Sequence, residues 1–133
     1  MLNSVTVVIP TYNSENTICR ALDSVRAQTL QPAEVIVVDD GSTDATVSTL
    51  EEYAAQHMDW PLRIVPLTEN HGPSYARNFG WDSCESEFVA FLDADDSWHR
   101  RKLELQIGYM VQHPEIALTA HRCICVAEQE PPA

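Results

Sequence analysis

The sequence predicts a single domain with an α/β fold, in which a mostly parallel sheet carries helices on both faces. Apolar runs of strand length alternate along the chain with segments whose apolar residues recur at helical spacing. Strands that alternate with helices are typical of parallel sheets with right-handed crossovers. With 133 residues and 44% hydrophobic composition, the chain has enough apolar material for one packed core.

The strand predictions depend on short runs that are β-branched or wholly apolar. The run from Val35 to Val38 is apolar throughout, as expected for a parallel strand covered on both faces. Pro10 bounds the first run, because proline cannot donate a hydrogen bond to a neighbouring strand. The predicted strands cover residues 5–9, 35–38, 62–67, 88–92 and 116–126.

Helices are predicted between these strands from the spacing of their apolar residues. Ile18, Leu22 and Val25 recur at i, i+4 and i+7, and Asn13 or Ser14 is placed to cap that helix. The same periodicity predicts further helices around residues 47–54, 74–83 and 98–112.

The charge of the chain excludes several classes of partner. Lys and Arg number 8 against 20 Asp and Glu, which gives a formal net charge of -12. A binder of nucleic-acid backbones would need a basic surface, so we expect no nucleic-acid partner. The longest apolar runs are far shorter than the roughly 18 residues of a membrane span, so we expect no membrane segment in these residues. The four cysteines form no C-x-x-C pair and follow no secretory leader, which favours a cytoplasmic location.

Two acidic segments follow predicted strands. One runs from Asp39 to Asp44 and the other from Asp93 to Asp96, and together they hold 6 of the 20 acidic residues. Because ligands of open parallel sheets bind at the carboxyl ends of the strands, both segments are expected at the binding edge. Converging carboxylates repel each other, and a divalent cation such as Mg²⁺ or Mn²⁺ would relieve that repulsion and admit a diphosphate.

Four segments give the chain a resemblance to a known family. They are Val-Val-Ile-Pro-Thr-Tyr-Asn at 7–13, Val-Val-Asp-Asp-Gly-Ser-Thr-Asp at 37–44, Asn-His-Gly-Pro through Ala-Arg-Asn-Phe-Gly at 70–80, and Phe-Leu-Asp-Ala-Asp-Asp-Ser-Trp at 91–98. In this order they resemble the amino-terminal, nucleotide-binding part of a family 2 glycosyltransferase with the Rossmann-like GT-A fold. The resemblance covers most of residues 1–133, which would form one donor-binding domain.

The resemblance implies a nucleoside pocket at the first two loops. Asp40, together with Asp39, would accept a hydrogen bond from the ring N–H of uracil, which favours a UDP-sugar as donor. The pocket would be lined by Pro10, Thr11, Tyr12 and Asn13.

The resemblance also implies a metal site at the fourth strand. Asp93, Ala94 and Asp95 match the D-x-D element that holds the divalent metal and touches the ribose, with Asp95 as first choice of ligand and Asp93 as second. Arg77 would lie near the diphosphate or brace the acidic loop. The metal would stabilise the departing nucleoside diphosphate while an acceptor hydroxyl attacks with inversion.

The catalytic base is not assigned. In the family it lies well downstream of the D-x-D element, and Glu115, Glu128 and Glu130 lack a supporting pattern. We therefore expect a truncated chain, the donor half of a larger enzyme, that is inactive by itself. The acceptor, whether saccharide, lipid-linked or another hydroxyl, stays open, as does attachment to the inner face of the membrane.

Two alternatives remain open at this point. The strand before Asp93 and the following Asp95 also resemble the nucleophile motif of a haloacid-dehalogenase-like phosphatase, although that motif usually opens its fold. A noncatalytic module that binds sugar nucleotides is the other. A dinucleotide-binding dehydrogenase is excluded, because residues 10–14 contain no glycine for a pyrophosphate turn.

Overall fold

The structure is a computed structural model that describes residues 4–119. Its centre is one four-stranded sheet with the order β3-β2-β1-β4, in which every neighbouring pair is parallel. The strands are β1 (Val5–Thr11), β2 (Glu34–Asp39), β3 (Leu62–Pro66) and β4 (Phe88–Phe91). The helices are α1 (Ile18–Arg26), α2 (Thr46–Gln56), α3 (Pro73–Asp82) and α4 (Lys102–Gln112). The parallel α/β fold that the sequence predicts is thus confirmed.

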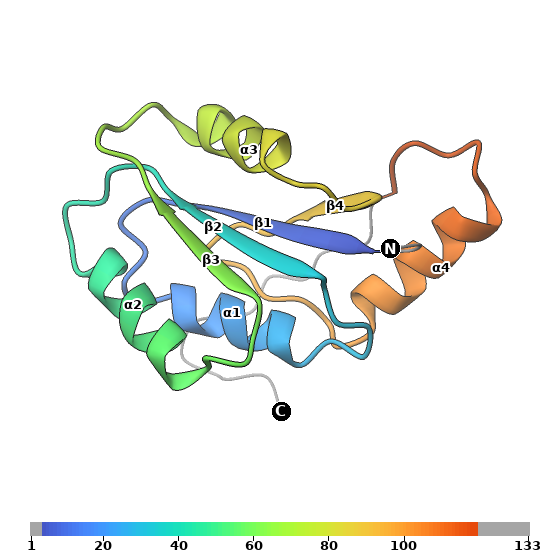
Figure 1. Cartoon of the computed structure of the whole chain (residues 1–133), viewed down its shortest axis with the longest axis horizontal. Coiled ribbons are helices and arrows are strands. Elements are labelled where there is room, and N and C mark those ends of the chain that lie inside the picture. The colour runs from blue at the N-terminus through green and yellow to red at the C-terminus, as the bar shows by residue number, and fades with distance from the viewer. Residues whose placement is uncertain (1–3, 120–133) are drawn as a thin grey trace.

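Helices cover both faces of the sheet. Figure 1 shows α3 on one face and α1 and α2 on the other. Leu103 and Ile107 of α4 join the same hydrophobic cluster as α1, which places them on the face opposite α3. Among the described residues, none of the helices is long and apolar enough to cross a membrane.

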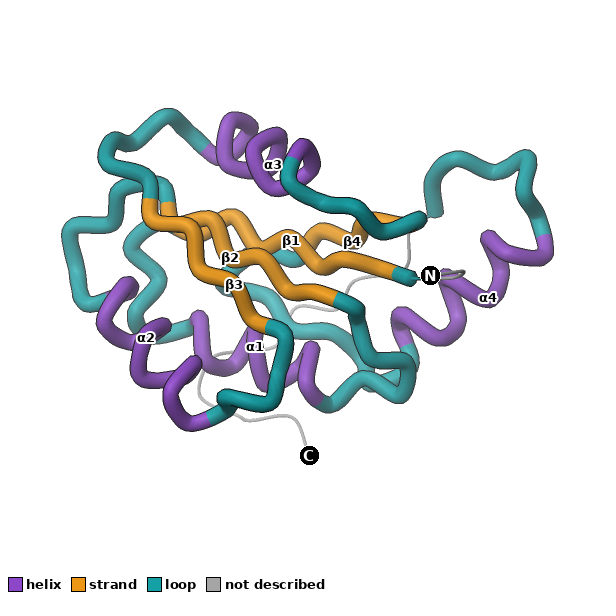
Figure 2. The backbone as a smooth tube through the Cα atoms, in the orientation of Figure 1, coloured by secondary structure: helices purple, strands orange, loops and turns teal. Residues whose placement is uncertain are grey.

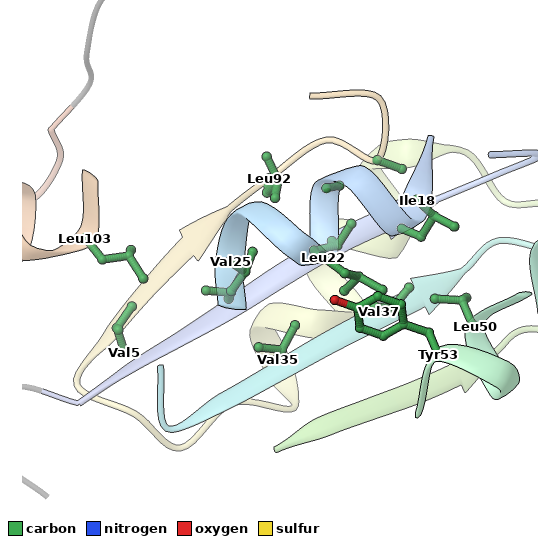
Figure 3. Packing of buried hydrophobic residues seen from close by; sticks show 14 of the residues in the cluster. Val5, Ile18, Leu22, Val25, Val35, Val37, Leu50, Tyr53, Leu92 and Leu103 are labelled. Carbon is green, nitrogen blue, oxygen red and sulfur yellow. The ribbon is translucent and has the colours of Figure 1, made fainter. Parts of the chain in front are cut away.

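The alternation of side chains along β2 explains the two-sided core. Val35 and Val37 pack into the larger cluster with α1 and α2, whereas Ile36 and Val38 pack with Ala76 of α3. Figure 3 shows the larger cluster, in which side chains from α1 lie over the strands. These four residues of β2 are all fully buried, as predicted for a strand covered on both faces.

Strand β1 runs two residues beyond the predicted end, and Pro10 lies inside it, paired with Val38 of β2. The backbone of Thr11 faces β2, because its carbonyl accepts from the Asp40 N–H, and the backbone of Val8 faces β4, because its carbonyl accepts from the Leu92 N–H. The nitrogen of Pro10 therefore points toward β4, beyond the last pair of that ladder at Val8 and Phe91. The missing N–H ends the pairing with β4 without disturbing β2.

Two other local predictions are wrong. Residues 116–119 form no strand, and the rest of the predicted last strand lies outside the described residues. Neither Asn13 nor Ser14 caps α1 with its side chain, because the Asn13 amide bonds the next loop and the Ser14 hydroxyl donates to the Tyr12 carbonyl. The Ser14 carbonyl instead accepts from the Thr17 and Ile18 N–H groups at the start of α1.

Candidate functional site

The parallel strands bring four loops to one edge of the sheet. The carboxyl ends of the strands lie on the left in Figures 1 and 2, and the loops that follow β1, β2 and β3 gather there. The segments from Asp39 to Asp44 and from Asp93 to Asp96 follow β2 and β4, two strands that both pair with β1. The two acidic segments therefore meet the same edge, as the sequence predicts.

The loop after β1 is tied to the loop after β2. Asn13 has a left-handed backbone (φ 46), which asparagine tolerates better than most residues. Its N–H donates to the Ser42 hydroxyl, and its side-chain oxygen accepts from the Thr43 N–H, both at 2.8 Å. The Ser14 N–H donates to the Thr46 hydroxyl at 2.8 Å. These bonds join the loop after β1 to the loop after β2 and to the start of α2 on one side of the site.

The Asp39 carboxylate is buried and accepts hydrogen bonds from its own loop. Its exposed fraction is 1%, and its oxygens accept from the Ser42 N–H at 3.0 Å and the Ser42 hydroxyl at 2.5 Å. Carboxylate acceptors of backbone N–H groups stabilise tight turns, so Asp39 shapes the start of the loop that it occupies.

The Asp40 carboxylate joins its loop to the loop before α3. One oxygen accepts from the His71 N–H and the other from the Gly72 N–H, each at 2.8 Å, and the residue is only 3% exposed. Gly41 lies against the same loop, since a Cβ there would be 2.9 Å from the Asn70 nitrogen, and its φ of 75 also favours glycine. Asp40 and Gly41 thus fix the amino-terminal end of α3 beside β2.

Arg77 reaches from α3 to the second acidic segment. Its guanidinium donates to the Asp93 carboxylate at 2.9 Å, and both side chains are partly exposed. Ala94 is buried, whereas Asp93, Asp95 and Asp96 are exposed. A turn closed by the Asp96 N–H and the Asp93 carbonyl presents these carboxylates to solvent at the edge of the sheet.

Like charges crowd this turn. Desolvation first, and then the charges of Asp95 and Asp93, raise the pKa of Asp96, while the guanidinium of Arg20 opposes the rise. An environment that disfavours a further negative charge is one that a cation would relieve.

The carboxylates of this turn could hold a divalent metal only together with other ligands. Within residues 4–119, no group of three or more His, Cys, Asp or Glu side chains is arranged around a common point as a metal site. Mg²⁺ commonly takes one or two carboxylates, with water and substrate phosphates as its other ligands. Because Asp93 is paired with Arg77 and Asp95 is exposed, the residues present fit a metal that binds together with a diphosphate.

The structure places the remaining predicted pocket residues at different depths. Pro10 and Thr11 are buried in β1, and the Thr11 hydroxyl donates to the Ile9 carbonyl. Tyr12 is 47% exposed, and Asn13 is also exposed. Tyr12 and Asn13 are therefore the accessible members of this group.

Sequence reasoning missed two residues that bond the connection between β4 and α4, namely Arg20 in α1 and Gln28 just after α1. The Arg20 guanidinium donates to the Asp95 carbonyl at 2.8 Å, and the buried Gln28 side chain bonds the backbone of residues that follow the acidic turn. A signal for Gln28 exists, because it continues the apolar face of Ala21 and Val25 at i+7 and i+3, where a polar residue needs a partner.

The fold and the site together define the class of the protein. The sequence model of Glycosyl transferase family 2 matches residues 6–131, so the chain belongs to that family. The assignment replaces the phosphatase alternative for Asp93.

Individual relatives agree with this assignment. The chain is 39% identical over 108 residues to a protein named "Putative teichuronic acid biosynthesis glycosyltransferase TuaG" of Bacillus subtilis, a match that covers 81% of this chain and 42% of that protein. It is 37% identical over 109 residues to "UDP-Glc:alpha-D-GlcNAc-diphosphoundecaprenol beta-1,3-glucosyltransferase WfgD" of Escherichia coli, with 82% of this chain and 42% of that protein covered. The chain thus spans less than half the length of these curated relatives.

Solved structures share the fold. S. aureus TarS in complex with UDP-GlcNAc has a TM-score of 0.75 at 35% identity, over 84% of this chain and 32% of that chain. The mannosyltransferase PcManGT from Pyrobaculum calidifontis, in complex with GDP-Man and Mn2+, has a TM-score of 0.68 at 39% identity, over 73% of this chain and 29% of that chain. These likenesses bear out the GT-A fold predicted from the sequence.

Proposed function

We propose that this chain is the donor-binding domain of a glycosyltransferase that transfers a sugar from a nucleoside-diphosphate sugar, preferably a UDP-sugar, to an acceptor hydroxyl. The observation that carries the proposal is the meeting of two acidic segments at the carboxyl edge of the sheet. The binding of UDP-GlcNAc by TarS and the use of UDP-Glc in the name of WfgD support a uridine donor.

The base and ribose would be bound by the first two loops. The exposed Tyr12 ring offers a face on which a base can stack, and Asn13 lies beside it. Asp39 and Asp40 each keep acceptor capacity, because a carboxylate has about four lone-pair sites and each of these accepts two hydrogen bonds. The ring N–H of uracil would use this capacity, while buried Pro10 and Thr11 form the floor beneath it.

The diphosphate would lie between α3 and the acidic turn. Arg77 is half exposed and would move from Asp93 toward a phosphate oxygen, which releases Asp93 as a ligand. Asp95 would be the principal metal ligand, and buried Ala94 sets the direction of the carboxylates on either side of it. A bound Mn²⁺ or Mg²⁺ would act as a Lewis acid that neutralises charge on the leaving diphosphate.

The transfer would invert the anomeric centre, with a carboxylate base that residues 4–119 do not supply in an identifiable position. Since the chain spans 42% of TuaG and of WfgD, we place the base and the acceptor site in sequence that corresponds to the rest of those proteins. The diphosphoundecaprenol acceptor in the name of WfgD supports a lipid-linked acceptor and action at the inner face of the membrane.

Calorimetric titration tests the donor assignment. UDP should bind in the presence of Mn²⁺ and much more weakly in the presence of a chelator, and GDP and ADP should bind more weakly than UDP. Asp95→Asn should abolish the Mn²⁺-dependent part, whereas Asp82→Asn on the exposed end of α3 should leave it intact. Equal UDP binding with and without metal would contradict the proposed role of the acidic turn.

The noncatalytic alternative is tested separately. UDP-sugar hydrolysis should be slow or absent with this chain. It should be measurable with a longer protein, meaning one that joins this chain to a region that corresponds to the rest of its relatives. Donor binding with no hydrolysis or transfer by the longer protein would favour a binding module.

A further inference from the structure

Gln28 is a buried polar side chain that connects the end of α1 to the segment after the acidic turn. Its exposed fraction is 4%, and its amide group donates to the His99 carbonyl at 2.8 Å and to the Ser24 carbonyl at 3.1 Å. Its side-chain oxygen accepts from the Leu103 N–H at 3.0 Å, at the start of α4. One side chain therefore joins both ends of the segment 99–103 to α1.

Two further contacts hold other residues of the connection between β4 and α4. The Thr29 N–H donates to the Arg100 carbonyl at 2.9 Å. From within α1, the Arg20 guanidinium donates to the Asp95 carbonyl at 2.8 Å. Residues 92–101 have neither helix nor strand structure, so contacts of this kind determine their conformation.

We propose that Gln28, two residues after the end of α1, is a positioning residue for the acidic turn, and that Arg20 assists it from within α1. The proposal rests on the proposed function, because it assigns the two residues to the metal-binding turn of the donor site. Gln28 touches neither donor nor metal. The connection between β4 and α4 is held at its start by β4 and at its end by Gln28. The carboxylates of Asp93 and Asp95 therefore meet the diphosphate in one orientation.

The physical reason is the cost of leaving the loop free. A loop without regular structure samples many conformations, and a metal site formed from it must order those residues when the ligand binds. Hydrogen bonds that order the loop beforehand remove this cost. Residues that orient metal ligands typically change metal affinity by about 10- to 100-fold when they are replaced.

The first experiment measures hydrogen exchange in the chain without nucleotide. In Gln28→Ala and in Arg20→Gln, amides of residues 93–103 should exchange about tenfold faster than in the wild type. The matched control is Gln31→Ala, since the Gln31 amide also donates to backbone carbonyls, those of Arg26 and Gln28, but makes no contact with the acidic loop. Unchanged exchange in both variants, or the same acceleration in Gln31→Ala, would overturn the proposal.

The second experiment measures how UDP binding depends on Mn²⁺. The Mn²⁺ concentration for half-maximal binding should rise about tenfold in Gln28→Ala and by a smaller factor in Arg20→Gln. Arg20→Lys should recover part of the loss, because lysine can still donate to the Asp95 carbonyl. Arg20→Gln removes an exposed side chain, so it tests the claim even if Gln28→Ala unfolds the domain.

The two proposals fail in different ways. If the wild type binds UDP with the same affinity in the presence and absence of Mn²⁺, the proposed donor site and the role of Gln28 in it are both refuted. If the wild type depends on Mn²⁺ and the Gln28 and Arg20 variants depend on it equally, only the positioning role is refuted.

Discussion

Replacement of Asp40 by asparagine should destabilise the domain through a loop that lies far away in sequence. Asp40 is buried and its two oxygens accept from the His71 and Gly72 N–H groups, each at 2.8 Å. Asparagine has one side-chain oxygen, so its amide nitrogen would face one of these N–H groups and leave that donor unpaired. A buried unpaired donor costs about 1–3 kcal/mol, and the surviving bond loses its charge, so we expect a loss of about 2–4 kcal/mol.

The assay is urea denaturation followed by tryptophan fluorescence and circular dichroism. Asp82→Asn is the control, because Asp82 is exposed at the end of α3 and should change the free energy of unfolding by less than about 0.5 kcal/mol. A loss in Asp40→Asn no larger than that of the control would refute the claim that Asp40 holds the loop before α3.

Two further predictions concern packing and ionisation. Gly80→Ala should destabilise the domain by about 1–3 kcal/mol, because the new Cβ would press against the Cγ1 methyl of buried Val8. Gly108→Ala should instead stabilise α4 by about 0.5–1 kcal/mol, because no heavy atom lies within 4 Å of the new Cβ. Urea denaturation measures both changes. Equal effects of the two substitutions would contradict the packing of α3 on β1. Burial lowers the pKa of Lys102 to about 8, so above that pH the unfolded chain binds more protons at this residue, and its contribution to stability should rise as the pH increases from about 8 to about 10.5. Lys102→Met should remove this part of the pH dependence and stabilise the domain at pH 7. If the free energy of unfolding changes with pH in parallel for wild type and variant, burial does not destabilise the Lys102 ammonium, which lies over the Trp98 ring.

The fold could be predicted from the sequence because local signals and tertiary structure agree along most of the chain. The apolar run of β2 and the helical spacing in α1 each indicate the element that forms. Pro10 shows the limit of the local signal, because whether a proline ends a strand depends on which neighbour its nitrogen faces. The apolar residues at 116–119 show it too, since strand propensity alone does not form a strand without a partner in the sheet.

The location of the candidate site could be predicted from the sequence, whereas most of the hydrogen bonds that shape it could not. Parallel strands bring the Asp39 and Asp93 segments to one edge, and the alternation of strands and helices in the sequence predicts parallel strands. The bond from the loop before α3 to Asp40 joins residues 31 positions apart in the chain, and the bond from the start of α4 to Gln28 joins residues 75 positions apart. Such pairings depend on the final packing, so no local pattern specifies them.

The most direct test of the donor site is diffraction from crystals of this chain grown with UDP and Mn²⁺, with data collected at an energy where manganese scatters anomalously. The account predicts one anomalous peak within coordination distance of an Asp95 carboxylate oxygen and of the diphosphate, with the uracil between Tyr12 and the loop that carries Asp39 and Asp40. A diphosphate bound away from the carboxyl edge of the sheet, or a manganese peak that does not touch the acidic turn, would contradict it.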